Sequence, residues 1–149
     1  MESIKQVKLS TTSFEKALTQ LETSYSYLNS ELARKDSKLR EQFRAATIKA
    51  FEYTYEISMR MVRRQLEQIS ANPTELHQLS FMDLIRTAAD AGLLKDTKAF
   101  RIYREKRNIT SHIYDAAKAE EVVSIIDGFL ADMHFLLDKL KQRNSEKND

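Results

Sequence analysis

The sequence has very few of the residues that end helices or form tight turns. Its 149 residues include 2 glycines and 1 proline, whereas these two types together make up roughly 12% of an average protein. Sheets need many tight turns, and tight turns favour residues with positive or preset φ. A sandwich, a barrel or a doubly wound sheet of this size is therefore disfavoured, and the sequence predicts an all-α fold.

Cysteine and long apolar runs are also missing. The absence of cysteine excludes a disulfide framework and any thiolate metal site. No apolar run approaches the roughly 18 residues of a membrane-spanning helix, and the N-terminal segment MESIKQVKLSTTSF is too polar for a signal peptide. These features predict a cytoplasmic protein without membrane contact. The length of the chain predicts one domain over 1–149, with a helical core at about 14–141 and a polar tail at 142–149.

The net charge of +2 is small, but its distribution is uneven. Residues 34–64 contain nine Lys or Arg against four Asp or Glu, whereas residues 115–138 contain one Lys against six Asp or Glu. If these segments form different helices, the molecule has one basic and one acidic side. Such asymmetry favours association with a partner, although ordinary solvated helix faces produce the same pattern.

Two long helices are predicted in the first half of the chain. The first is marked by apolar residues at alternating spacings of four and three, with a turn expected within 33–38: Phe14, Leu18, Leu21, Tyr25, Leu28 and Leu32. The second is expected over 37–69, with a buried stripe of Leu39, Phe43, Ala46, Ala50, Ile57, Met61 and Leu66. Residues 51–56 alternate in the manner of a strand, but nothing near them ends a helix, and we therefore predict helix there.

The second half predicts shorter helices followed by one long helix. Asn72-Pro73 interrupts the chain and indicates a loop over 70–79, after which Ser80 begins a short helix that Gly92 ends. Asp96 is placed to cap a helix over about 97–108. The last helix, over about 116–142, would bury Val122, Ile125, Phe129, Met133, Leu136 and Leu140. This order favours an antiparallel, up-and-down bundle of four to five helices.

Most catalytic and metal-binding motifs are absent. The sequence has no glycine-rich phosphate loop, no GxSxG, no HExxH and no Cys/His zinc spacing. Its carboxylates are spaced for surface ion pairs such as Glu56 with Arg60, and we predict neither a metal site nor a cofactor. His77 and His134 are interpreted as structural or simply exposed residues.

The segment over 98–115 differs from this background. Five of its first ten residues are Lys or Arg, and Arg107, Asn108, Ser111, His112 and Tyr114 follow closely. Arginine binds phosphate with a planar fork of donors, and histidine exchanges protons near neutral pH. Together they suit phosphodiester chemistry, in which a hydroxyl is deprotonated and an anionic transition state is stabilised.

A continuous helix would keep the two key residues of this segment apart. At roughly 100° per residue, Arg107 and His112 would point about 140° away from each other. Their convergence therefore requires the helix to end between them, which Asn108, Thr110 and Ser111 permit. A network at a helix end that only holds the bundle together would use the same residue types.

The run Arg107-Asn108-Ile109-Thr110-Ser111-His112-Ile113-Tyr114 matches the R-x4-H-x-Y motif of HEPN-domain proteins. The wider pattern resembles one HEPN branch, the nucleotidyltransferase substrate-binding protein family related to the HepT toxins. Phe51-Glu52-Tyr53-Thr54-Tyr55-Glu56 is similar to the second-helix signature of that branch, and Ala119-Glu120-Glu121 opens the last helix as in family members. The similarity extends over about 14–141.

The resemblance implies a helical bundle that forms a homodimer and pairs with a small nucleotidyltransferase encoded nearby. By position, Arg107 and His112 would be the catalytic pair of a metal-independent ribonuclease toxin, supported by Asn108 and Ser111. RNA would be the substrate, and the nucleotidyltransferase would act as antitoxin by adenylylating Tyr114. Two alternatives remain open: a non-catalytic substrate- or nucleotide-binding subunit of a two-component nucleotidyltransferase, and a structural helical adaptor.

Overall fold

The computed structural model of the chain describes residues 8–145, and all regular secondary structure in this part is helical, without strands. Its elements are α1 (Thr12–Leu28), α2 (Glu31–Lys35), α3 (Ser37–Ile69), α4 (Pro73–Leu76), α5 (Phe81–Asp90), α6 (Thr97–Asn108), the 3-10 turn η1 (Thr110–His112), α7 (Ala116–Val123) and α8 (Ile126–Ser145). The predicted all-α class is confirmed. The second long helix has the predicted bounds of 37–69.

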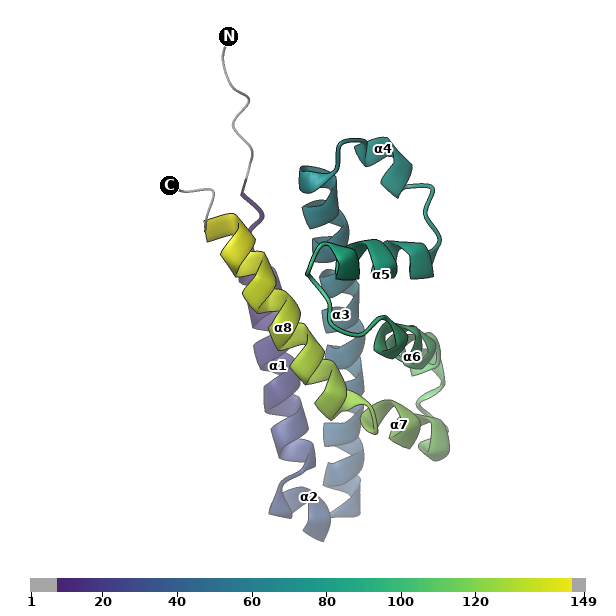
Figure 1. The fold of residues 1–149 in the computed structure, drawn as a ribbon. Coiled ribbons are helices and arrows are strands. Elements are labelled where there is room, and N and C mark those ends of the chain that lie inside the picture. The colour runs from purple at the N-terminus through teal and green to yellow at the C-terminus, as the bar shows by residue number, and fades with distance from the viewer. Residues whose placement is uncertain (1–7, 146–149) are drawn as a thin grey trace.

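The helices α1, α3 and α8 form the long body of the molecule (Figure 1). The helices α1 and α8 are antiparallel. Glu15 near the start of α1 pairs with Lys141 near the end of α8 at 2.7 Å, and Glu22 further along α1 approaches the earlier residue His134 at 3.3 Å. The helices α3 and α8 run in the same direction. The short helices between them lie on the opposite side of α3 from α1, and α5 crosses α3 instead of running along it (Figure 1). They carry the chain back toward the middle of α3, where α8 begins.

The hydrophobic core fills the space between these helices. Its largest fully buried side chains are Phe14, Phe51, Phe100, Phe129, Leu18, Leu21, Ile48, Leu66, Leu84, Ile85, Leu93 and Ile126. The segment over 51–56 is helical, as predicted: Phe51, Thr54 and Tyr55 are buried, whereas Tyr53 faces solvent. Helical periodicity over the whole element therefore outweighs the local strand-like alternation.

The predicted helix ends around α5 and α6 are confirmed. Ser80 accepts a hydrogen bond from the Asp83 backbone N–H, and Asp96 accepts one from the Lys98 N–H. Gly92 ends α5 with φ of +82°, a conformation that glycine adopts without a steric penalty. These local signals fix where α5 ends and where α6 starts.

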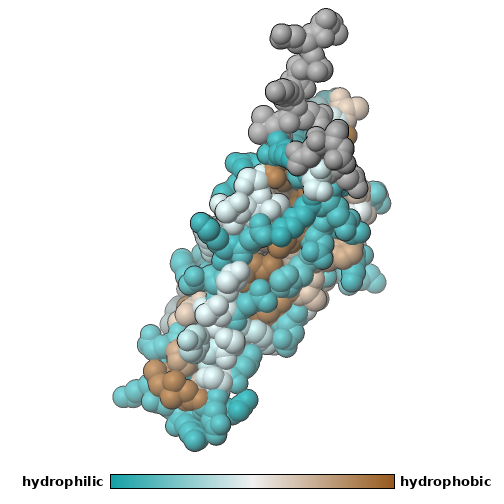
Figure 2. All heavy atoms as spheres, turned by 90° about the vertical axis from the view of Figure 1, so that its left-hand side faces the viewer, coloured by the Kyte–Doolittle hydropathy of each residue, from teal (hydrophilic) through white to brown (hydrophobic). Residues whose placement is uncertain are grey.

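The first helix is shorter than predicted. It ends at Leu28, and Ser30 starts the separate short helix α2 by accepting a hydrogen bond from the Ala33 N–H. This break takes Leu32 off the buried stripe, and its side chain is 53% exposed. The apolar atoms at the lower end of the face in Figure 2 lie over this region. Ala46, also predicted to be buried, is exposed because it lies at the margin of the contact between α1 and α3.

The last helix differs from its prediction at both ends. It is interrupted between α7 and α8, where the Ser124 hydroxyl donates to the Glu121 carbonyl at 2.6 Å. It also continues to Ser145, so that part of the predicted polar tail is helical, and residues 146–149 lie outside the described residues. The buried Asn144 side chain accepts a hydrogen bond from the Leu9 backbone N–H and donates one to Gln65. These bonds secure the end of α8 against α3 and the segment before α1.

A carboxylate at the start of the C-terminal helices joins α7 to α3. Glu120 accepts hydrogen bonds from Arg40 at 2.5 and 3.2 Å and from Arg44 at 3.0 Å. The hydrogen bond from Arg40 is the main reason that the pKa of Glu120 lies below its ordinary value, and Arg44 adds to the effect. Glu120 therefore stabilises the fold in its charged form.

We expect Glu120→Gln to lower the free energy of unfolding by roughly 1 kcal/mol at neutral pH, since the ion pairs are partly exposed. A carboxyl whose pKa is lower in the folded than in the unfolded chain stabilises the fold above its unfolded pKa of about 4.3. The difference between wild type and variant should therefore shrink as the pH falls below that value. Urea unfolding at several pH values measures this difference in the free energy of unfolding.

Glu121→Gln is the control, because Glu121 has no ion pair in the described part of the chain. An equal effect of both variants would contradict the role of Glu120.

Candidate functional site

The helix that carries the motif ends inside it. α6 stops at Asn108, and the chain turns through η1 before Asp115 caps α7 by accepting hydrogen bonds from the backbone N–H groups of Ala117 and Lys118. The Thr110 hydroxyl donates to the Arg107 carbonyl at 2.8 Å, which closes this turn. The predicted helix end between Arg107 and His112 is therefore present, and the side chains on either side of it no longer follow one helical spiral.

Arg107 is held against α3 by a carboxylate. One terminal nitrogen of its guanidinium donates to Glu56 in a short ion pair. Glu56 thus pairs across the bundle with Arg107, and no ion pair in the described part of the chain joins it to the predicted partner, Arg60. Both side chains remain partly open to solvent, with exposed fractions of 34% for Arg107 and 43% for Glu56. The pair fixes the guanidinium while leaving some of its five N–H donors available to an anion.

A second carboxylate of α3 holds the turn itself. The Thr110 hydroxyl shares its single proton between the Arg107 carbonyl and Glu52, which lies 2.6 Å away. Lys49 lies 3.6 Å from the other oxygen of the same carboxylate. The hydrogen bond from Thr110 is the largest cause of the lowered pKa of Glu52, and the charges of Lys49 and Arg107 act in the same direction. Glu52 is therefore a charged anchor for η1.

Glu52 and Glu56 are site residues that the sequence pattern did not predict, whereas Thr110 was expected only to permit the helix end and also anchors it to α3. The two carboxylates lie one turn apart on the same face of α3, within the segment 51–56 that resembles the second-helix signature of the family. Each contacts the motif segment, more than fifty residues away in sequence. The carboxylates of the segment 51–56 therefore hold the motif segment 107–114 in place, which gives a physical reason for the two patterns to occur in one chain.

His112 and Tyr114 form a separate exposed pair. The Nδ1 atom of His112 lies 3.4 Å from the Tyr114 hydroxyl, and the two rings meet edge to face at 6.0 Å. Tyr114 is 84% exposed, the largest value among the exposed apolar and aromatic residues. Within the described residues, no hydrogen bond or ion pair links His112 to Arg107. Asn108 and Ser111 are exposed, and their side chains have no hydrogen-bond partner in the described part of the chain.

The other two histidines lie away from the motif. His77 approaches Glu67 at 3.8 Å, and His134 approaches Glu22 at 3.3 Å, both on exposed surfaces. Among the residues over 8–145, no group of three or more His, Asp or Glu could hold a metal ion. No helix in this part of the chain is long and apolar enough to cross a bilayer. The motif segment is thus the one region in this part where a guanidinium, an imidazole and an exposed phenol occur close together in sequence.

Comparisons with known proteins agree with this arrangement. Residues 9–142 match the family described as nucleotidyltransferase substrate binding protein like. The chain is 44% identical over 100 residues to a Haemophilus influenzae protein named "Probable ribonuclease HepT", which covers 67% of this chain and 68% of that protein. A solved structure from the same organism, described as the fold of a substrate binding domain of a nucleotidyltransferase, superposes with a TM-score of 0.84 and 34% identity. It covers 89% of this chain and 99% of its own. The chain belongs to the nucleotidyltransferase substrate binding protein like family.

Proposed function

We propose that the protein is a metal-independent endoribonuclease of the HEPN type and that its site is built from Arg107 and His112. The observation that carries the proposal is the helix end between these residues: Glu56 fixes the Arg107 guanidinium before the turn, and His112 presents an exposed imidazole at the end of η1. The similarity to a protein named as a ribonuclease supports it.

The reaction that fits these groups is transfer of a phosphodiester to a neighbouring hydroxyl. The 2′-oxygen of a ribose attacks the adjacent phosphorus, and the bond from phosphorus to the 5′-oxygen of the next nucleotide breaks. His112 takes the proton of the 2′-hydroxyl or delivers one to the leaving 5′-oxygen. Arg107 stabilises the negative charge on the phosphoryl oxygens. Asn108 and Ser111, whose side chains have no hydrogen-bond partner among residues 8–145, orient the phosphate or the imidazole.

One histidine per motif supplies a base or an acid, but the reaction uses both. A homodimer that brings two motifs together provides the second proton-transfer group. Exposure of His112 and Tyr114 in the single chain agrees with a site that faces a second protomer or a partner. The dimer is therefore part of the proposal.

The second part of the proposal concerns Tyr114 and a nucleotidyltransferase antitoxin. The exposed Tyr114 oxygen would attack the α-phosphorus of ATP in the partner's active site, with loss of pyrophosphate and of the phenolic proton. Because that oxygen lies 3.4 Å from His112, an attached adenylyl group would occupy the space around the imidazole. Its phosphate would also repel RNA, which would switch the ribonuclease off.

The test is incubation of the purified protein with single-stranded RNA in the presence of EDTA. We expect fragments that end in a 2′,3′-cyclic phosphate. Protein that is first treated with the nucleotidyltransferase and Mg²⁺-ATP, and is then assayed with RNA in excess EDTA, should form none. An inert wild type that still binds the nucleotidyltransferase would overturn the ribonuclease and favour a non-catalytic substrate-binding subunit, which the description of the structural neighbour supports. A protein that neither cleaves RNA nor binds the nucleotidyltransferase would favour a structural adaptor.

A further prediction concerns Glu56 as a positioning residue. Glu56→Ala frees the Arg107 side chain, and we expect kcat to fall by about ten-fold or more because the guanidinium is no longer held where charge develops. Glu56→Gln keeps an oxygen that accepts the same hydrogen bond and should recover most of the activity. The measurement is kcat and KM on one defined RNA. Equal losses of kcat in both variants would show that activity depends on the negative charge of Glu56 and not on the hydrogen bond that positions Arg107.

A further inference from the structure

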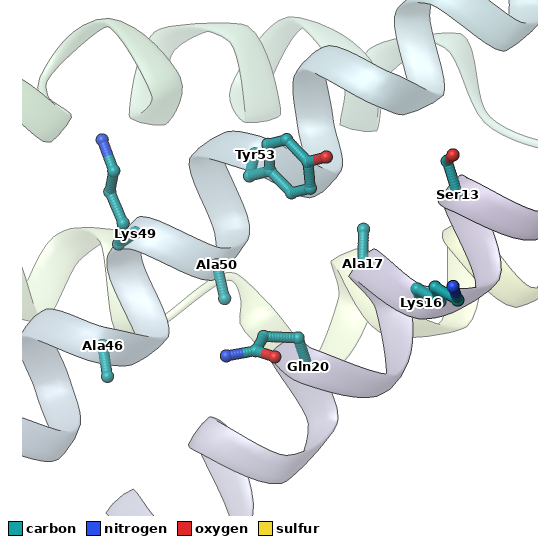
Figure 3. Close-up of a pocket in the computed structure, with 8 residues that line it drawn as sticks. All are labelled: Ser13, Lys16, Ala17, Gln20, Ala46, Lys49, Ala50 and Tyr53. Carbon is teal, nitrogen blue, oxygen red and sulfur yellow. The ribbon is translucent and has the colours of Figure 1, made fainter.

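Beside the motif lies a groove between α1 and α3 that the mechanism does not use. It has a volume of about 550 Å³ and is lined by Ser13, Lys16, Ala17, Gln20, Ala46, Lys49, Ala50 and Tyr53. Figure 3 shows the small side chains of Ala17 and Ala50 between the two helices, with the Tyr53 ring standing at the rim on the α3 side. The alanines form the floor, and the polar side chains and Tyr53 form the walls.

The groove is linked to the motif through one lysine. Lys49 lines the groove on α3, and its side chain points away from α1 (Figure 3). Its Nζ atom lies 3.6 Å from Glu52, which in turn accepts the hydrogen bond from Thr110 of the motif turn. The groove and the catalytic segment therefore lie on adjacent faces of the same stretch of α3.

The chemistry of the walls suits a polyanion that carries rings. Tyr53 is 56% exposed although it is a large aromatic residue, and such a ring is a platform on which a base can stack. Lys16 is exposed and has no ion pair within the described residues. Arg60, seven positions after Tyr53 on α3, is also exposed and without an ion pair in that part of the chain. The carboxylates next to this surface, Glu52 and Glu56, are already paired with cations.

We propose that this groove binds the single-stranded RNA next to the cut site, with Tyr53 stacking on a base and Lys16 contacting a phosphate. The inference rests on the proposed ribonuclease function and adds a second contact region for the same substrate. The lining on α3 from Ala46 to Tyr53 spans about 10 Å at 1.5 Å per residue. An open groove of that length fits a short stretch of a strand passing to or from the motif.

Binding of RNA to uncleaving protein tests the groove independently of catalysis. All measurements use the full chain with His112→Ala, a labelled long single-stranded RNA and fluorescence anisotropy. Adding Tyr53→Ala should raise Kd by about five-fold or more, the usual effect of losing one stacked base. Tyr53→Phe keeps the ring and should bind like the parent. Adding Lys16→Gln should reduce the slope of log Kd against log salt by about 0.7, as expected for one lost phosphate contact on a single strand.

The control variants replace similar residues outside the groove. Tyr27 is 54% exposed, and Lys38 is an exposed lysine at the start of α3 without an ion pair in the described part of the chain. Tyr27→Ala and Lys38→Gln should leave Kd and its salt dependence unchanged.

Two results would overturn the groove as an RNA site. One is an unchanged Kd in Tyr53→Ala while the parent protein binds the RNA. The other is a change of oligomeric state in Tyr53→Ala, measured by light scattering, which would assign the groove to a protein contact. Failure of the proposed function has a different signature: wild type that binds the RNA through Tyr53 but does not cleave it.

Discussion

Replacing His112 with alanine is expected to lower the rate of RNA cleavage by about 10³-fold. A positioned acid or base accelerates proton transfer by about 10² to 10⁴-fold, and no other imidazole lies near the motif in the part of the chain that the structure describes. The fold should be unaffected, because the side chain is exposed and its one polar contact, with Tyr114, is long at 3.4 Å. Initial rates on a defined RNA in EDTA measure the effect, and circular dichroism checks the fold.

The chain supplies its own controls for this experiment. His134 is also an exposed histidine beside an oxygen-bearing side chain, Glu22, but it lies on α8 away from the motif. His134→Ala should therefore cleave RNA at the rate of the wild type. Arg107→Ala should lose about 10²-fold or more, since it removes the charge that we propose stabilises the phosphoryl oxygens. If His112→Ala retained the wild-type rate, or if His134→Ala lost as much, the assignment of the site would be wrong.

Local signals in the sequence were sufficient for several helix ends. Ser80, Gly92 and Asp96 each act within one turn of their own position, through a hydrogen bond to the backbone or a positive φ. Their effect does not depend on what packs against the helix. For this reason the start of α6 could be predicted from the sequence. The helix end inside the motif was expected from Asn108, Thr110 and Ser111, whose side chains can bond to the backbone.

The breaks that were missed have no glycine or proline. At Ser30 and at Ser124 a hydroxyl donates to the carbonyl three residues earlier, at 2.5 and 2.6 Å. Serine competes with the backbone in this way in many sequences where the helix nevertheless continues. The outcome depends on how the following segment packs: α2 turns toward α3, and α7 is held to α3 by Glu120. Tertiary contacts, which the sequence pattern does not contain, decide these positions.

The same limit applies to the carboxylates of the candidate site. From spacing alone, Glu56 has a suitable cation four residues later in Arg60, and a local pair is the simplest expectation. The structure pairs Glu56 with Arg107, 51 positions away. Family resemblance indicated that residues 51–56 and 107–114 occur together, but only the fold shows that α6 lies against this face of α3. The motif could be found in the sequence, whereas the residues that position it could not.

The second large effect concerns the packing that brings α6, α3 and α8 together. Phe129 is fully buried on α8, and its ring meets those of Phe51 at 4.7 Å and Tyr103 at 5.1 Å, both edge to face. It is thus the contact between the helix that carries the motif, the helix that carries the two carboxylates, and the last helix. Aromatic pairs in this geometry contribute beyond their buried area.

We expect Phe129→Ala to lower the free energy of unfolding by about 3 to 5 kcal/mol, because truncating a buried phenylalanine removes apolar contacts and leaves a cavity. That is a large part of the roughly 5 to 15 kcal/mol that stabilises a typical domain. Urea unfolding at fixed protein concentration measures the loss as a lower midpoint with an unchanged slope.

Phe135→Ala is the control on the same helix, since its ring is only partly buried and lies under Lys95 and Lys139. A loss in Phe129→Ala no larger than that in Phe135→Ala would show that the ring contacts do not hold the three helices together. Cleavage by Phe129→Ala, measured where the variant is still folded, should also be reduced, because the position of Arg107 depends on how α6 packs against α3.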